Sequence, residues 1–173
     1  MKKLIIGILL IFCFFVFSCT SVPNANARKK TLVIGQIILE VKELRASSPS
    51  LVGTHKQGIE IIIENIESGK SYSLKSQKNG LFYSTGLKAG NYKISRVIFK
   101  KSSGPTSTGI GWSPQRDFIV EEGYVNNMGV LEWISSNRTA TFSGNQKFIE
   151  VREYFQNNFS SSNWNEYEWL NTK

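Results

Sequence analysis

Cysteine, histidine, aspartate and proline are all scarce in this chain of 173 residues, which holds two Cys, one His and four Pro. Both cysteines, Cys13 and Cys19, lie near the start, so the rest of the chain has no thiol for a disulfide, a metal cluster or a nucleophile. The sequence therefore predicts a domain that is stabilised by its hydrophobic core alone, with no cofactor.

The scarcity of His and Asp restricts the available catalytic chemistry. A Ser-His-Asp triad would need both His55 and Asp117. His55 lies in a polar stretch that we interpret as a solvated loop, and Asp117 beside Arg116 is interpreted as a surface pair at the start of a strand. Zinc needs three or four suitable ligands, which one His does not support. We predict no catalytic residues and no metal site.

A hydrolase that uses two glutamates is the alternative, with an envelope glycan or peptide as its substrate. Glu60 and Glu64 are four residues apart in an expected strand, so they face the same side. We interpret them as the solvent face of that strand. Glu121 and Glu122 lie in an expected turn and are interpreted as solvated.

The N-terminus carries the longest apolar run. Two lysines, Lys2 and Lys3, precede the unbroken apolar segment Leu4–Phe17, and Ser18-Cys19 follow it. This run is shorter than the ~20 residues of a membrane-spanning helix and is typical of an export signal.

Val16-Phe17-Ser18-Cys19 resembles the lipobox of bacterial lipoproteins. The resemblance implies that residues 1–18 are a signal peptide and that Cys19 becomes the lipid-bearing first residue, with three acyl chains. It also implies a place in the cell envelope, at the outer membrane if the cell has two, because Thr20-Ser21 lacks a retaining Asp. The alternatives are an uncleaved anchor or an ordinary secretory signal.

The formal net charge is +8, and its densest cationic run is Arg28-Lys29-Lys30. A basic run close to a lipid anchor is expected to lie over anionic headgroups. The membrane, reached through the N-terminal lipid, is thus one expected partner, and an envelope protein or glycan is another. Nucleic acid is not expected as a partner of an exported protein.

Residues 19–30 are rich in Asn, Ser and basic side chains and predict a flexible tether. Residues 31–135 predict a mainly β domain, a seven-stranded antiparallel sandwich of immunoglobulin-like type. Its expected strands are Thr31–Lys42, Ile59–Asn65, Ser71–Lys75, Leu81–Ser84, Asn91–Lys100, Arg116–Val120 and Asn126–Ser135. The expected long loops are Arg45–Gln57 and Lys101–Pro114.

Residues 143–173 predict a C-terminal helix followed by an aromatic tail. Apolar residues from Asn145 to Phe159 recur at helical spacing, and Ser143 and Asn145 are candidate caps. The tail that follows contains Trp164, Tyr167 and Trp169.

The segment Gly58–Val97 carries a family resemblance. Its motifs resemble, in their order, those of carboxypeptidase-regulatory-like domains. They are Asn65 with Ser68-Gly69, then Asn79-Gly80 before Phe82, then Gly86-Leu87, and finally Ala89-Gly90 before Tyr92 and Ile94. With Leu32–Glu40 and Phe118–Trp133, the resemblance covers about residues 32–134. It implies a transthyretin-like sandwich with Phe82, Leu87, Tyr92 and Ile94 facing inward. The family's domains are mainly accessory modules, so the resemblance implies no activity.

Four aromatic residues are candidate contacts for a ligand or partner. Trp112 lies in the Gly-rich stretch Gly109–Trp112, which is either a plain flexible loop or a binding loop. Trp164, Tyr167 and Trp169 either pack on the β-domain, contact a partner or lie at the lipid interface. We expect a non-catalytic binding or accessory module, and a surface adhesin is an alternative if these aromatics form one exposed patch.

Overall fold

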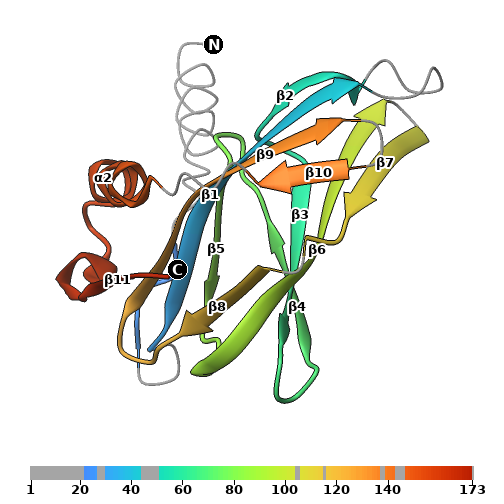
Figure 1. Ribbon diagram of the computed structural model, residues 1–173. Coiled ribbons are helices and arrows are strands. Elements are labelled where there is room, and N and C mark those ends of the chain that lie inside the picture. The colour runs from blue at the N-terminus through green and yellow to red at the C-terminus, as the bar shows by residue number, and fades with distance from the viewer. Residues whose placement is uncertain are drawn as a thin grey trace, which may run out of the picture.

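The computed structural model describes residues 22–26, 30–43, 51–103, 106–114, 116–136, 139–142 and 147–172. They form two facing β-sheets with a helical C-terminal segment outside them (Figure 1). The expected signal peptide and Cys19 lie outside the described residues. No helix within these ranges is long and apolar enough to cross a membrane.

The six-stranded sheet is built around two parallel neighbours, β1 (Leu32–Glu43) and β9 (Val125–Ser136). On the free side of β1 lie two antiparallel strands, β2 (Gly53–His55) and β5 (Leu81–Thr85). On the free side of β9 lie the antiparallel β10 (Thr139–Phe142) and the parallel β11 (Trp169–Asn171).

The five-stranded sheet is wholly antiparallel and faces the first sheet. Its order is β4 (Ser71–Lys75), β3 (Ile59–Asn65), β6 (Gly90–Ser103) and β7 (Thr106–Trp112), and β8 (Arg116–Val120) pairs with the first half of β6. The side chains of β3 alternate strictly between buried and half-buried, because one face of this sheet meets the core and the other meets solvent.

The mainly β architecture with a C-terminal helix is confirmed, and so are all seven expected strands. The strand count was wrong, however, because the described residues contain eleven strands. The expected loop Lys101–Pro114 is mostly the hairpin of β6 and β7, whose register runs from Val97↔Trp112 to Ser103↔Thr106. Gly, Ser and Thr dominate this segment, so its pattern did not resemble a strand. An all-antiparallel arrangement was also wrong, since β9 is parallel to both β1 and β11.

The central pair β1 and β9 is covered on both faces. One face contributes Val33, Ile37 and Leu39 to the core between the sheets, which we call the interlayer core. The other face contributes Leu32 and Ile34 to a second cluster beneath the C-terminal helix, which we call the outer core. Parallel strands that are buried on both faces have nearly continuous apolar sequences, as β1 does.

A β-bulge interrupts the pairing of β9 with β1. Its register against β1 shifts between Ile34↔Asn127 and Gln36↔Val130, and Gly129 at the shift has φ +68°. Glycine adopts this left-handed conformation without a Cβ penalty. The Asn127 side chain accepts a hydrogen bond from the Gly129 N–H (2.9 Å) and donates one to the Phe148 carbonyl (2.9 Å). The bulge therefore also positions the C-terminal helix.

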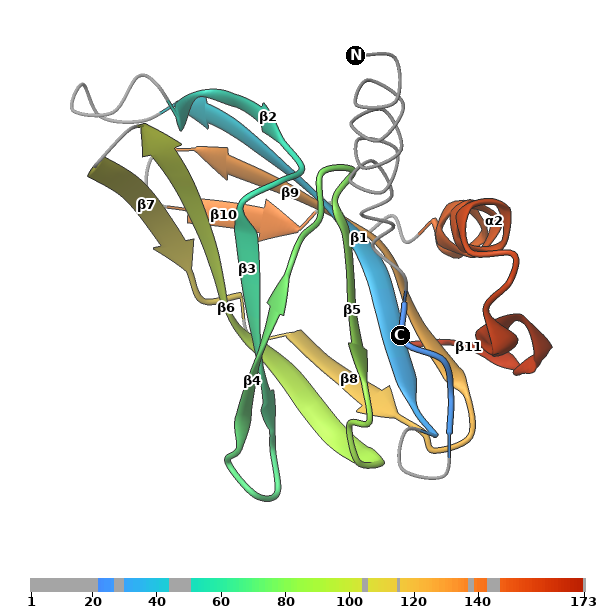
Figure 2. The ribbon, with the colours of Figure 1, turned by 180° about the vertical axis from the view of Figure 1, so that it is seen from behind.

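Residues 147–172 form the C-terminal appendage, which lies on the outer face of the six-stranded sheet (Figures 1 and 2). It comprises α2 (Phe148–Asn158), the 3₁₀ helix η2 (Asn163–Glu166) and β11. The expected helix is confirmed, although the candidate caps Ser143 and Asn145 lie outside the described residues. Lys147 is the N-cap, and its side chain makes no capping hydrogen bond.

The described part of the expected tether is docked on the protein. Val22 is buried in the outer core, and residues 23–25 hydrogen-bond to η2. The prediction of a flexible tether over residues 19–30 is therefore wrong for this part of it. The reason is that the polar side chains and backbone of this segment find distant partners, which local composition does not reveal.

Candidate functional site

A surface cavity of about 370 Å³ lies at one end of the five-stranded sheet, between the β3–β4 turn and the β5–β6 turn. Its volume is within the range of small-ligand sites, about 300–1,000 Å³. We call it the turn pocket, and it is lined by Asn65, Glu67, Ser68, Lys70, Tyr72, Lys88, Ala89 and Tyr92.

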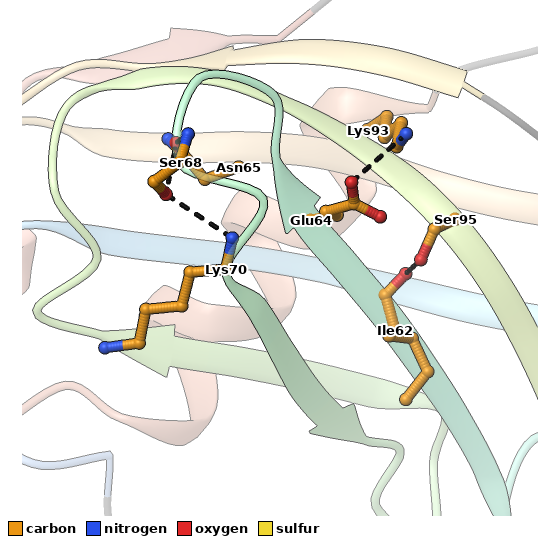
Figure 3. Close-up of polar contacts among 7 residues, drawn as sticks. All are labelled: Ile62, Glu64, Asn65, Ser68, Lys70, Lys93 and Ser95. Carbon is orange, nitrogen blue, oxygen red and sulfur yellow. Dashed lines mark hydrogen bonds and ion pairs between the residues drawn. The ribbon is translucent and has the colours of Figure 1, made fainter.

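Asn65 shapes the β3–β4 side of the turn pocket. Its Oδ1 accepts hydrogen bonds from the Ser68 N–H (2.8 Å) and the Ser68 hydroxyl (2.7 Å). Its backbone pairs with the Lys70 carbonyl and the Gly69 N–H, and Gly69 takes a φ of +67°. Figure 3 shows Asn65 and Ser68 gathered inside the turn, with the Lys70 side chain leading away from it. An Asx-type turn of this kind holds its residues in one conformation.

Two tyrosines form the aromatic part of the pocket. Tyr92 is buried, stacks on Phe118 (5.7 Å between ring centroids) and donates its hydroxyl to the Lys88 carbonyl (2.9 Å). Burial raises the pKa of Tyr92, so its phenol stays neutral. Tyr72 is half-buried with its ring centroid 6.2 Å from that of Tyr92, and the Lys70 Nζ lies 5.2 Å from the Tyr72 centroid.

The rim of the turn pocket carries more positive than negative charge. Lys70 and Lys88 are exposed there, against one exposed carboxylate, Glu67. The neighbouring ion pair of Glu64 with Lys93 (3.3 Å, Figure 3) is internally neutral. An aromatic wall with hydroxyl, amide and ammonium groups can stack on a ring and hydrogen-bond to polar or anionic groups. The lining residues include no His, Cys or Asp.

A second cavity of about 320 Å³ lies beside Glu60 at the other end of the same sheet, lined also by Gln57, Gly58, Ile59, Lys75, Ser76 and Lys100. The Ser73 hydroxyl donates to Glu60 (2.6 Å), and Lys100 lies 3.4 Å from its carboxylate. These contacts hold the pKa of Glu60 below its usual value. A lowered pKa is the opposite of what a general acid needs.

The two glutamates of the hydrolase alternative are far apart. Glu60 and Glu64 share one face of β3, where four residues span about 13 Å. Paired carboxyls of glycosidases lie roughly 5–9.5 Å apart. Each of the two also has its own lysine partner, Lys100 or Lys93. Across the described residues, no three His, Cys, Asp or Glu side chains gather as a metal site would require.

The structure distributes the four candidate aromatics over two cores. Trp112 lies on β7, is 8% exposed and belongs to the interlayer core, so it is not on a loop. Trp164 is fully buried in the outer core. Half-buried Tyr167 packs against Trp164, and half-buried Trp169 packs against Phe155 in the same core. Trp112 and Trp164 therefore do not share an exposed patch. None of the four lines the turn pocket.

His55 and Arg116 are also placed differently from the predictions. His55 lies on β2, donates from Nε2 to the Leu51 carbonyl (2.8 Å) and stacks on Phe99 (4.1 Å between centroids), so it is not a solvated loop residue. Arg116 faces the interior 4.3 Å from the Phe142 ring, while Asp117 is exposed. They are not a surface pair, because neighbouring strand residues point to opposite faces.

Buried hydrogen-bond donors beside Phe142 were not anticipated. Arg116 Nη1, Trp133 Nε1 and Ser135 Oγ are buried, and no hydrogen-bond partner for them is present in the described structure. Burial lowers the pKa of the Arg116 guanidinium, whose carbon lies 4.3 Å from the centre of the Phe142 ring in a cation–π contact. The one available signal was the strand predicted over residues 116–120, because the period of two of a strand places Arg116 on the same face as Phe118.

The turn pocket was not predicted as a site. Asn65, Ser68-Gly69 and Ala89-Gly90 were named only as motifs of the family resemblance, and Lys70, Tyr72 and Lys88 were not identified as site residues. The pocket exists only because two turns about twenty residues apart in sequence meet at one sheet end, and that meeting has no local signal.

Comparisons with known proteins place few constraints on this chain. No family model matches it, and no curated protein matches it. Among solved structures, it is similar to a leucine-rich repeat protein from Bacteroides thetaiotaomicron with a TM-score of 0.41 and 16% sequence identity. The match covers 66% of this chain and 15% of that one, and at this TM-score it carries no argument about fold or function.

Proposed function

We propose that the chain is a bacterial envelope lipoprotein whose β-domain is a non-catalytic binding module. The support for the anchor is the order of a basic start, an apolar run of signal-peptide length and Ser18-Cys19. Each buried lipid methylene contributes about 0.8 kcal/mol, so several acyl chains on Cys19 hold a protein firmly at a membrane. If the cell has two membranes, the outer one is the proposed location.

We further propose that the β-domain is a transthyretin-like sandwich related to carboxypeptidase-regulatory-like domains. The support is the position of the shared motifs on the strands and turns. Asn65 with Ser68-Gly69 forms the β3–β4 turn, and Ala89-Gly90 lies at the start of β6. The four residues expected to face inward, Phe82, Leu87, Tyr92 and Ile94, all belong to the interlayer core.

The turn pocket carries the proposal of a binding function. Its Asx turn and buried Tyr92 give it a fixed shape, Tyr72 offers a ring, and Lys70 and Lys88 supply cations. We propose that it binds a segment of an envelope glycan that bears carboxylate or phosphate groups. Aromatic rings stack on sugar faces, and ammonium groups pair with anions in the same way as with carboxylates of proteins.

Binding of anionic glycan fragments to the lipid-free chain, measured by calorimetry, tests this function. We expect Lys70→Ala/Lys88→Ala to weaken binding by tenfold or more, which is about 1.4 kcal/mol. The Lys88 carbonyl that anchors Tyr92 is retained in this variant. The charge-matched control is Lys42→Ala/Lys78→Ala, two exposed lysines that line none of the cavities described above.

Equal affinity of the two double variants for the fragments would refute the role of the turn pocket. Crosslinking in intact cells, followed by mass spectrometry, is the complementary experiment. An envelope protein that is captured by the wild type and lost from Lys70→Ala/Lys88→Ala would replace the glycan as the partner and make the module an accessory subunit.

A further inference from the structure

The N-terminal segment 22–26 is clasped by the 3₁₀ helix η2 of the C-terminal appendage. The Trp164 indole N–H donates to the Pro23 carbonyl (2.8 Å), and the Ala25 N–H donates to Asn163 Oδ1 (2.8 Å). Asn163 Nδ2 donates in return to the Ala25 carbonyl (3.1 Å), and its backbone N–H donates to Asn24 Oδ1 (3.3 Å). These four bonds and the burial of Val22 fix where the chain enters the domain.

Very little chain separates this clasp from the proposed lipid. Only Thr20 and Ser21 lie between Cys19 and the buried Val22. Three residue steps span at most about 11 Å, even when fully extended. An anchor on Cys19 therefore cannot lie far from the appendage, and the membrane surface must come close to η2 and α2.

The appendage presents a surface that fits this position. Ile149 on α2 is 71% exposed, the highest value among the exposed large hydrophobic residues of the described chain. Arg152 and Glu153 both lie about one helical turn further along and are exposed, so the charges on this face offset one another. A membrane contact is therefore supported by the exposed apolar side chain of Ile149 and by the short link to Cys19, and not by charge.

We propose that the α2 and η2 face of the appendage rests on the lipid surface that holds the Cys19 acyl chains. The lipid anchor and the appendage then form one attachment, and the domain does not swing on a tether. In both views of the ribbon, α2 and η2 lie on one side of the sandwich and the β3–β4 turn lies on the other (Figures 1 and 2). The turn pocket is consequently held away from the bilayer. This inference rests on the proposed lipidation of Cys19.

A single introduced thiol can report the contact, because the mature lipidated chain has no other free cysteine. Full-length Ile149→Cys and the matched exposed control Ser71→Cys on β4 are expressed in cells, labelled with a fluorophore and reconstituted into phosphatidylcholine–phosphatidylglycerol vesicles that contain a headgroup-attached quencher. We expect the label at 149 to be quenched several-fold more strongly than the label at 71. Insertion of a long Gly-Ser spacer between Thr20 and Ser21 is expected to reduce the quenching at 149.

The outcomes separate the two proposals. Equal quenching at the two positions in a protein whose N-terminal peptide has the mass of acylated Cys19 would overturn the membrane contact and leave the lipoprotein proposal standing. An N-terminal peptide without lipid would overturn both. Unchanged quenching at 149 after insertion of the spacer would overturn the role of the short link.

Discussion

The two sheets differ in what covers their outer faces. The five-stranded sheet is covered on its inner face only, and the burial of β3 alternates residue by residue. The six-stranded sheet has the interlayer core on one side and the appendage on the other, and residues 125–131 of β9 are all buried. The interlayer core and the outer core therefore share the strands β1 and β9. A substitution in either core should destabilise a different and identifiable part of the structure.

The largest expected effect comes from the interlayer core, at the shared strand β9. Trp133 is 1% exposed and packs against Phe142 (5.6 Å between centroids). Trp133→Ala should lower the free energy of unfolding by about 3–5 kcal/mol, the usual cost of removing a large buried aromatic. Chemical denaturation measures this loss of free energy. The backbone amides of both sheets should lose their protection against hydrogen exchange together. A loss confined to the appendage would contradict the shared-strand description.

A smaller and more local effect is expected in the outer core. Trp164→Ala removes a fully buried ring and the hydrogen bond to the Pro23 carbonyl. The loss should be about 3 kcal/mol or less, because the sandwich can remain folded when the appendage detaches. Hydrogen exchange should rise over residues 22–26 and 148–171 and stay unchanged over 59–65. Faster exchange in β3 would show that the two cores do not unfold independently of each other.

The bulge on β9 should contribute less than either ring. Asn127→Ala leaves the Gly129 N–H and the Phe148 carbonyl without their present partner, which should cost about 1–3 kcal/mol. Asn158→Ala is the matched control, since Asn158 is exposed and bonds only within α2. Thermal unfolding of the two variants measures the difference. Equal melting temperatures would mean that the bulge does not hold the appendage.

The smallest effect is expected on the solvent face of the five-stranded sheet. Contacts with Ser73 and Lys100 lower the pKa of Glu60, so ionised Glu60 stabilises the fold above its unfolded-state pKa. That stability is lost as the pH falls through the lower, folded-state value. Glu60→Gln should remove at most about 1 kcal/mol at neutral pH, as for other exposed pairs, and nothing in strong acid. Denaturation at several pH values tests this, and an equal loss at acid pH would assign it to another cause.

The same contrast explains what the sequence could predict. β3, β4 and β8 were predicted with their observed bounds, because short segments with Ile, Val, Tyr or Phe stand between residues that favour turns. The appendage helix was visible through the spacing of Val151, Tyr154, Phe155 and Phe159. The docking of residues 22–25 on the appendage could not be predicted, because the hydrogen bonds of this segment go to Asn163 and Trp164 at the other end of the chain.

The candidate site follows the same rule. The turns around it were predictable from Asn65, Gly69 and Gly90, because each turn is set by its own few residues. The pocket between them depends on tertiary contact, as does the inward course of Arg116 toward Phe142. Of the four conspicuous aromatics, Trp112 and Trp164 are buried, because large rings contribute more free energy in a core than on a surface. A contact role for half-buried Tyr167 and Trp169 stays a prediction.

The parallel pairing of β1 with β9 sets the order of events in folding. Leu32 pairs with Val125, and Pro23 and Ala25 hydrogen-bond to Trp164 and Asn163. Each of these contacts joins residues that are far apart in the sequence. Such a high contact order makes loop closure slow, because chain entropy is lost before these contacts form. A chain that crosses a membrane from its N-terminus would therefore emerge almost entirely before its central sheet could close. Completion of the domain would then be among the last steps, after the C-terminus is released.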